Sequence, residues 1–102
     1  MAKPNVFSCL FFLLLSVSIS KGDWCVVKFS APDPPLQSFL DSACSKLDCS
    51  PVRPGGSCYE PNDLKRHASW VLDLNYRTNN VCPLDIGTIA ITDPSYGTCH
   101  YP

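Results

Sequence analysis

The cysteines constrain this chain more than any other feature. Its 102 residues include seven cysteines, of which Cys9 lies in an apolar N-terminal stretch. The other six all follow residue 20: Cys25, Cys44, Cys49, Cys58, Cys82 and Cys99. In an oxidising compartment, a short chain with an even set of cysteines is held together by disulfides, and the sequence alone leaves their pairing open. A chain of about 80 residues needs such bridges, because one apolar core of that size supplies only a few kcal/mol.

The N-terminal stretch predicts secretion. Lys3 precedes an apolar run over residues 6–19, which is too short to span a bilayer comfortably. Ser18 and Ser20 have the spacing that signal peptidase needs for cleavage before Lys21. We therefore expect a signal peptide over residues 1–20, or cleavage as late as residue 22, followed by a single domain over residues 21–102. Because no hydrophobic tail follows, we expect no membrane anchor after signal removal and a free extracellular protein.

The mature part predicts a small α+β fold. Residues 24–29 and 87–92 are rich in strand-forming side chains and predict a short two-stranded antiparallel sheet. Asp33 precedes two prolines and is expected to cap a first helix. Its apolar stripe is a core face made of Leu36, Phe39, Leu40, Ala43, Cys44 and Leu47.

A second helix is expected from about residue 61 to about residue 77. Its predicted core face comprises Leu64, Ala68, Val71, Leu72 and Asn75, with His67 at the edge as a structural histidine. Trp70 falls on the opposite side, among charged residues, and is either an exposed aromatic platform or packed under another segment. Tyr76, on the flank, is open to the same two interpretations.

The charge balance narrows the ligand class. Eight basic and nine acidic side chains give a net charge of −1, and binding to nucleic acid would require a basic surface. We expect a neutral ligand, no nucleic-acid partner, no cofactor and no bound metal. Cys44, Cys49 and His67 loosely imitate zinc-ligand spacing, but thiolates are usually oxidised in secreted proteins.

One neighbourhood has the chemistry that sugar recognition needs. A pyranose packs its C–H face on an aromatic ring, and its hydroxyls need polar partners. Candidate ligand-binding residues are Tyr59, Glu60, Asn62, Asp63, Arg66, Trp70 and, further along, Tyr76. Asn62 is alternatively the cap of the second helix. Tyr96, His100 and Tyr101 are expected to serve packing or to lie on the surface.

The cysteine-rich run resembles a known family. Asp48-Cys49-Ser50-Pro51, the segment over residues 54–62, His67-Ala68-Ser69 and Asp93-Pro94-Ser95 are similar to motifs of the plant family-43 carbohydrate-binding modules. The resemblance extends over residues 24–102. It implies the pairs Cys25–Cys82, Cys44–Cys49 and Cys58–Cys99. It also implies a non-catalytic module that binds β-1,3-glucan, such as callose or laminarin-like chains, in the plant cell wall. We expect a monomer.

Two departures from the family pattern concern aromatics. The family usually has Asp-Phe-Gly-Gly after the fifth cysteine, where this chain has residues 83–87, Pro-Leu-Asp-Ile-Gly. Where the family often has two adjacent aromatics, this chain has Asn75-Tyr76. If the missing rings are ligand platforms, we expect glucan affinity to be weaker or differently directed; if they are core residues, we expect Leu84 to substitute tolerably.

Two other function classes stay open at this stage. One is a disulfide-stapled secreted protein that recognises a protein or lipid partner. The other, an enzyme, is disfavoured, because a glycosidase needs two carboxylates across a substrate cleft and this domain is too small for a long one.

Overall fold

The computed structural model describes residues 22–102, so the predicted signal peptide lies outside the described residues. The element order is β1 (Trp24–Val27), α2 (Asp33–Ala43), a 3₁₀ turn η1 (Ser50–Val52), α3 (Leu64–Asn79) and β2 (Gly87–Ala90). The small disulfide-rich α+β fold with two main helices and a two-stranded antiparallel sheet is thereby confirmed. Among the described residues, no helix is both long and apolar enough to cross a bilayer.

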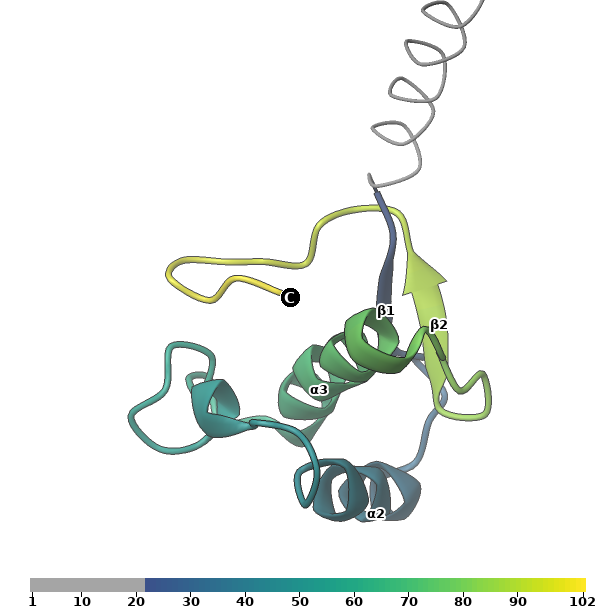
Figure 1. Cartoon of the computed structure of the whole chain (residues 1–102), viewed down its shortest axis with the longest axis horizontal. Helices are drawn as coiled ribbons and strands as arrows, with labels where there is room; N and C mark the ends of the chain where they lie inside the picture. The colour runs from purple at the N-terminus through teal and green to yellow at the C-terminus, as the bar shows by residue number, and fades with distance from the viewer. Residues whose placement is uncertain (1–21) are drawn as a thin grey trace, which may run out of the picture.

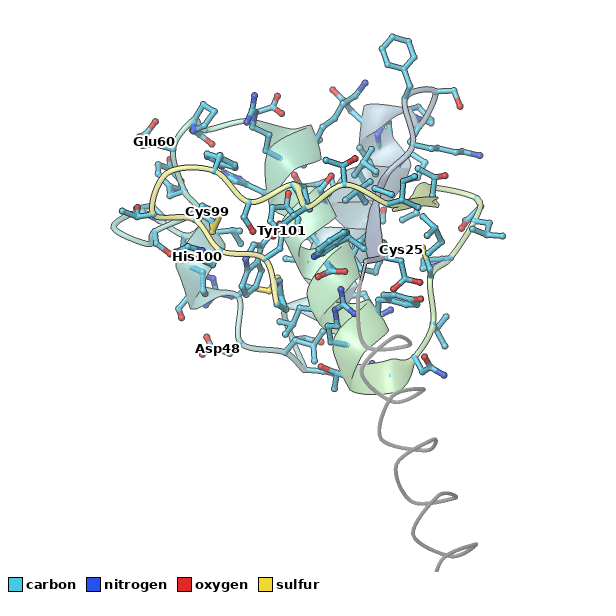
Figure 2. The ribbon with its side chains drawn as sticks, turned by 90° about the horizontal axis from the view of Figure 1, so that it is seen from above. Cys25, Asp48, Glu60, Cys99, His100 and Tyr101 are labelled. Atoms are coloured by element: carbon cyan, nitrogen blue, oxygen red, sulfur yellow. A yellow bond between two sulfur atoms is a disulfide. The ribbon has the colours of Figure 1, made fainter. Side chains whose placement is uncertain are left out.

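Helix α3 is the centre of the domain. It packs against β1 and against α2 (Figure 1). Ala68, Val71 and Leu72 are wholly buried, as the sequence predicted, whereas Leu64 and Asn75 at the ends of the predicted face are only half-buried. The C-terminal segment covers the other side of α3 and carries Cys99, His100 and Tyr101 across it (Figure 2). Helix α3 is therefore buried on more than one side.

The sheet is short and lies on α3. Strands β1 and β2 pair antiparallel with Trp24 opposite Ala90 and Val27 opposite Gly87. The predicted first strand was too long, because the chain turns after Lys28: the N–H of Ala31 donates to the carbonyl of Lys28 at 3.0 Å. Phe29 therefore stands outside the sheet.

Strand β1 is fixed to α3 by two side chains. Asp73 Oδ1 accepts from the backbone N–H of Cys25, and Ser69 Oγ accepts from that of Val27, both at 3.0 Å. Ser69 and Asp73 are four residues apart, so they lie on one face of the helix. Their side-chain oxygens accept from two alternate N–H groups of β1. Without these oxygens, the two N–H groups would have no acceptor inside the domain.

The helix boundaries differ slightly from the prediction. Pro32, not Asp33, is the N-cap of α2, and Asp33 lies in the first turn, where a carboxylate still favours the helix dipole. Leu36 and Leu40 are buried as expected. Helix α3 begins three residues late because Asp63 is its cap: an Asp63 carboxylate oxygen accepts from the N–H of Arg66 at 3.0 Å. Asn62 is thus not the cap.

Three disulfides close the domain: Cys25–Cys82, Cys44–Cys49 and Cys58–Cys99. These are the pairs that the family resemblance implied, and the first and third span 57 and 41 residues. In the loop-entropy account, each long closure stabilises the fold by about 4 kcal/mol and the short one by about 2 kcal/mol. Cys44 and Cys49 are joined in a disulfide, so neither offers the thiolate that zinc ligation at this spacing would require.

Candidate binding surface

Tyr59 is held rigidly beside the N-terminal end of α3. Its ring stacks on that of His67, with 5.3 Å between the centroids and 26° between the planes. His67 Nε2 also lies 2.7 Å from the carbonyl oxygen of Tyr59, so His67 has the structural role that the sequence predicted. The neighbouring Cys58 is buried in its disulfide with Cys99. Tyr59 is half-buried and therefore presents a pre-organised aromatic edge to solvent.

Tyr96 lies next to the segment that carries Tyr59. Its hydroxyl donates to the carbonyl of Glu60 at 3.3 Å, and the Arg66 guanidinium lies over its ring, 5.2 Å from the centroid. The sequence predicts only a packing or surface role for Tyr96 and does not indicate this position. A usable signal was its place three residues before Cys99, because that bridge returns the C-terminal segment to Tyr59.

The turn that presents Tyr96 is well defined. Backbone hydrogen bonds run both ways between Tyr96 and Cys99, at 3.0 and 2.8 Å, and Gly97 between them has φ +53°. Upstream, Asp93 Oδ1 accepts from the N–H of Ser95 at 2.9 Å. Hydrogen bonds from the Ser95 side chain and backbone lower the pKa of Asp93. The carboxylate therefore stays charged and keeps the turn closed.

Four residues make up what we call the aromatic surface: Tyr59, Glu60, Arg66 and Tyr96. Glu60 is exposed at the edge of the domain (Figure 2), and Asn62 is exposed two residues further on. Three of the predicted ligand residues, Tyr59, Glu60 and Arg66, are thus brought together. Asp63 is close in sequence, but one of its carboxylate oxygens is engaged as the α3 cap.

Trp70 is not an exposed aromatic platform, which was one of the two interpretations of its position in the sequence. Only 7% of the residue is exposed, and its Nε1–H donates to the carbonyl of His100 at 3.1 Å. The prediction erred because the helical periodicity defined one core face, whereas the C-terminal segment forms a second cover over α3. The alternative interpretation, packing under another segment, is the one observed.

Tyr76 lies away from the aromatic surface. It is ten residues beyond Arg66 on α3, or about 15 Å along the axis. Its hydroxyl donates to Asp23 Oδ2 at 3.0 Å, and the Arg77 guanidinium lies 5.5 Å from its ring centroid. The bond to the Asp23 carboxylate raises the pKa of Tyr76. Its polar tip is engaged within the protein.

Two open clefts flank the aromatic surface. One, of about 430 Å³, lies between α2, the Cys44–Cys49 bridge and His67, with Gln37, Asp41 and Arg53 among its polar groups. The other, of about 420 Å³, lies between the turn after β1 and the start of α3. Arg66 lines this second cleft and also covers Tyr96, so the cleft adjoins the aromatic surface.

Comparison with known proteins agrees with the resemblance seen in the sequence. A family model of the X8 domain matches residues 23–84. A glucan endo-1,3-beta-glucosidase of Triticum aestivum is 40% identical over 85 residues, covering 78% of this chain and 18% of the relative. The chain thus spans about a fifth of the length of such glucosidases.

Two shorter relatives are covered more fully. The major pollen allergen Ole e 10 of Olea europaea is 40% identical over 85 residues, which is 76% of this chain and 69% of the relative. Plasmodesmata callose-binding protein 2 of Arabidopsis thaliana is 33% identical over 95 residues, covering 87% of this chain and 49% of the relative.

Proposed function

The chain belongs to the X8 domain family of six-cysteine carbohydrate-binding modules, and from that premise we propose that it binds β-1,3-glucan without hydrolysing it. The observation that carries the proposal is the aromatic surface, where Tyr59 and Tyr96 are held rigidly beside polar groups. The names of its relatives support the choice of ligand, since one is a callose-binding protein and others are glucan endo-1,3-beta-glucosidases.

The aromatic surface offers both kinds of contact that a glucan chain needs. The rings of Tyr59 and Tyr96 supply the apolar part, on which the C–H face of a glucose unit packs. Glu60 and Arg66, with the exposed Asn62 next to the surface, supply acceptors and donors that replace the water lost from the sugar hydroxyls. Because Tyr59 is fixed by His67, and Tyr96 by Glu60 and Arg66, little side-chain entropy is lost on binding.

The distribution of carboxylates supports a non-catalytic role. Glycosidases place two carboxyl groups on either side of the scissile bond. The aromatic surface contains one carboxylate, Glu60, and of the two clefts beside it, one is lined by a single carboxylate, Asp41, and the other by none. In this proposal, any hydrolysis of the bound glucan is the work of a separate protein.

The proposal extends to where the protein acts. We place the mature module, residues 21–102, outside the cell, in the wall, as a monomer released from a signal peptide over residues 1–20. Three disulfides support an oxidising compartment. Callose, a wall β-1,3-glucan, is then the ligand within reach.

The test is affinity electrophoresis of the purified protein in gels that contain laminarin, with a β-1,4-glucan gel as control. We expect retardation by laminarin alone, little change as salt rises from about 0.05 to 0.5 M, and no release of reducing sugar. Reduced and alkylated protein serves as the unfolded control. Equal retardation in both gels, or hydrolysis by protein free of contaminating glucanase, would overturn the proposal.

A further inference from the structure

The second cleft has a composition unlike the rest of this weakly acidic chain. Three cationic side chains line it: Lys28, Lys65 and Arg66. No carboxylate lines it, and neither lysine forms an ion pair within residues 22–102. Lys28 Nζ donates to the carbonyl of Leu84 at 3.2 Å, and Lys65 Nζ to that of Phe29 at 3.5 Å. The cleft therefore carries three positive charges that form no ion pair with a carboxylate of residues 22–102.

An aromatic ring stands at the edge of this cleft. Phe29 is 97% exposed, the most exposed of the large apolar residues in the described part of the chain. It lies in the turn after β1, and Lys65 Nζ lies 5.7 Å from its ring centroid. Single exposed apolar side chains are common on protein surfaces, but Phe29 differs from the others in lining a cleft beside cationic side chains.

Hydroxyl groups complete the lining. Ser69 and Tyr101 are among the residues that line the cleft with the cations, and Ser69 Oγ, which accepts from the N–H of Val27, can still donate its own hydrogen. Burial raises the pKa of Tyr101 to about 12, so its hydroxyl stays neutral and does not repel an anion.

From these observations we propose that the cleft formed by Lys28, Phe29, Lys65, Arg66, Ser69 and Tyr101 binds the uronate units of an acidic polysaccharide. A uronate has the same apolar C–H face as a neutral sugar, which packs on Phe29. Its carboxylate pairs with the lysines or with Arg66, and its hydroxyls reach Ser69 and Tyr101. The site shares Arg66 with the aromatic surface, but Lys28, Phe29 and Lys65 belong to the cleft alone, so their contribution can be measured separately from glucan binding.

An anionic membrane is the competing partner for a basic site with an exposed phenylalanine. Membrane-surface segments place several apolar side chains together beside the basic ones. Here Phe29 alone among the exposed large apolar residues lines the cleft, and the site is concave and contains hydroxyls. The structure therefore favours a polysaccharide.

The test measures binding of the full chain, produced through a secretory host, to polygalacturonate, to its fully methyl-esterified form and to laminarin. We expect polygalacturonate to bind and to dissociate as salt rises, and the neutral ester to bind at least about fivefold more weakly. The double variant Lys28→Gln/Lys65→Gln should lose about fivefold in polygalacturonate affinity and keep laminarin affinity within about twofold.

Matched controls are available on the same chain. Lys46→Gln makes the same lysine-to-glutamine change at one position outside the cleft, and Ile91→Ala removes another exposed apolar side chain. Both should bind polygalacturonate like the parent, whereas Phe29→Leu, which keeps the apolar character but not the ring, should bind about fivefold more weakly.

Parent-like binding by the double-lysine variant, or equal binding of the ester, would overturn the proposal. So would binding to anionic phospholipid vesicles without binding to polygalacturonate. The laminarin result, measured separately, reports on the glucan proposal alone.

Discussion

Asp73 of α3 accepts a hydrogen bond from the backbone N–H of Cys25 in β1, with 3.0 Å between Asp73 Oδ1 and Cys25 N and both residues wholly buried. The other carboxylate oxygen, Oδ2, lies 3.5 Å from Arg77 Nε and is otherwise unpartnered. This contact joins the central helix, the sheet and the Cys25–Cys82 bridge at one point.

Removing the Asp73 carboxylate should therefore loosen β1. Asp73→Ala leaves the buried N–H of Cys25 without an acceptor and should lower the free energy of unfolding by about 1–3 kcal/mol. Asp73→Asn keeps an acceptor oxygen and should cost less. Guanidinium unfolding with the disulfides intact, followed by tryptophan fluorescence, measures both. Equal losses for the two variants would show that the hydrogen bond to Cys25 is not what Asp73 contributes.

The same residue should make stability depend on pH. Burial raises the pKa of Asp73, and the hydrogen bond from Cys25 and the charge of Arg77 offset this only in part. The folded state therefore holds the proton more tightly than the unfolded chain, whose aspartate pKa is about 3.9. The stabilisation is therefore complete at pH values below the unfolded pKa of about 3.9. It is lost as pH rises through the folded pKa, and the free energy of unfolding falls by up to about 1.4 kcal/mol per pH unit.

The pH prediction is checked by unfolding the parent and Asp73→Asn at a series of pH values from about 4 to 7. The variant has no carboxylate to titrate, so its stability relative to the parent should increase with pH over the window. Parallel curves would mean that Asp73 does not titrate in this range.

Trp70 should matter for folding and not for ligand contact. Trp70→Phe keeps a buried aromatic but removes the donor to His100, so we expect a loss of about 1 kcal/mol in stability. Laminarin affinity of the folded variant should stay within about twofold of the parent. Loss of laminarin binding with unchanged stability would instead make Trp70 part of the binding site.

The helices and strands of this fold could be predicted from the sequence more fully than the tertiary contacts between them. The stripe containing Leu36 and Leu40 and the central residues Ala68, Val71 and Leu72 follow from helical periodicity, which is a local property. The burial of Trp70 does not, because it depends on where Cys58–Cys99 returns a segment from far along the chain. Ser69 and Asp73 were missed for the same reason: their partners are backbone N–H groups of a strand 42 and 48 residues away.

The candidate site was predicted in part. Tyr59, Glu60 and Arg66 are neighbours in sequence, so their juxtaposition followed from a cap, a short loop and one helical turn. Tyr96 joins them through a disulfide and could not be placed without the fold. The residue type of Phe29 favours a strand, but β1 ends at Val27 and Phe29 lies in the turn closed by the hydrogen bond from Ala31 to Lys28.

The measurement that tests the central claim most directly is the affinity for laminarin of Tyr59→Ala and Tyr96→Ala, with Tyr76→Leu as the aromatic control from the far end of α3. If the aromatic surface binds the glucan, each of the first two variants should lose about 1–3 kcal/mol of binding free energy while staying folded by circular dichroism. Tyr76→Leu should bind within about twofold of the parent. Parent-like binding by both Tyr59→Ala and Tyr96→Ala would contradict the assignment of the glucan site to this surface.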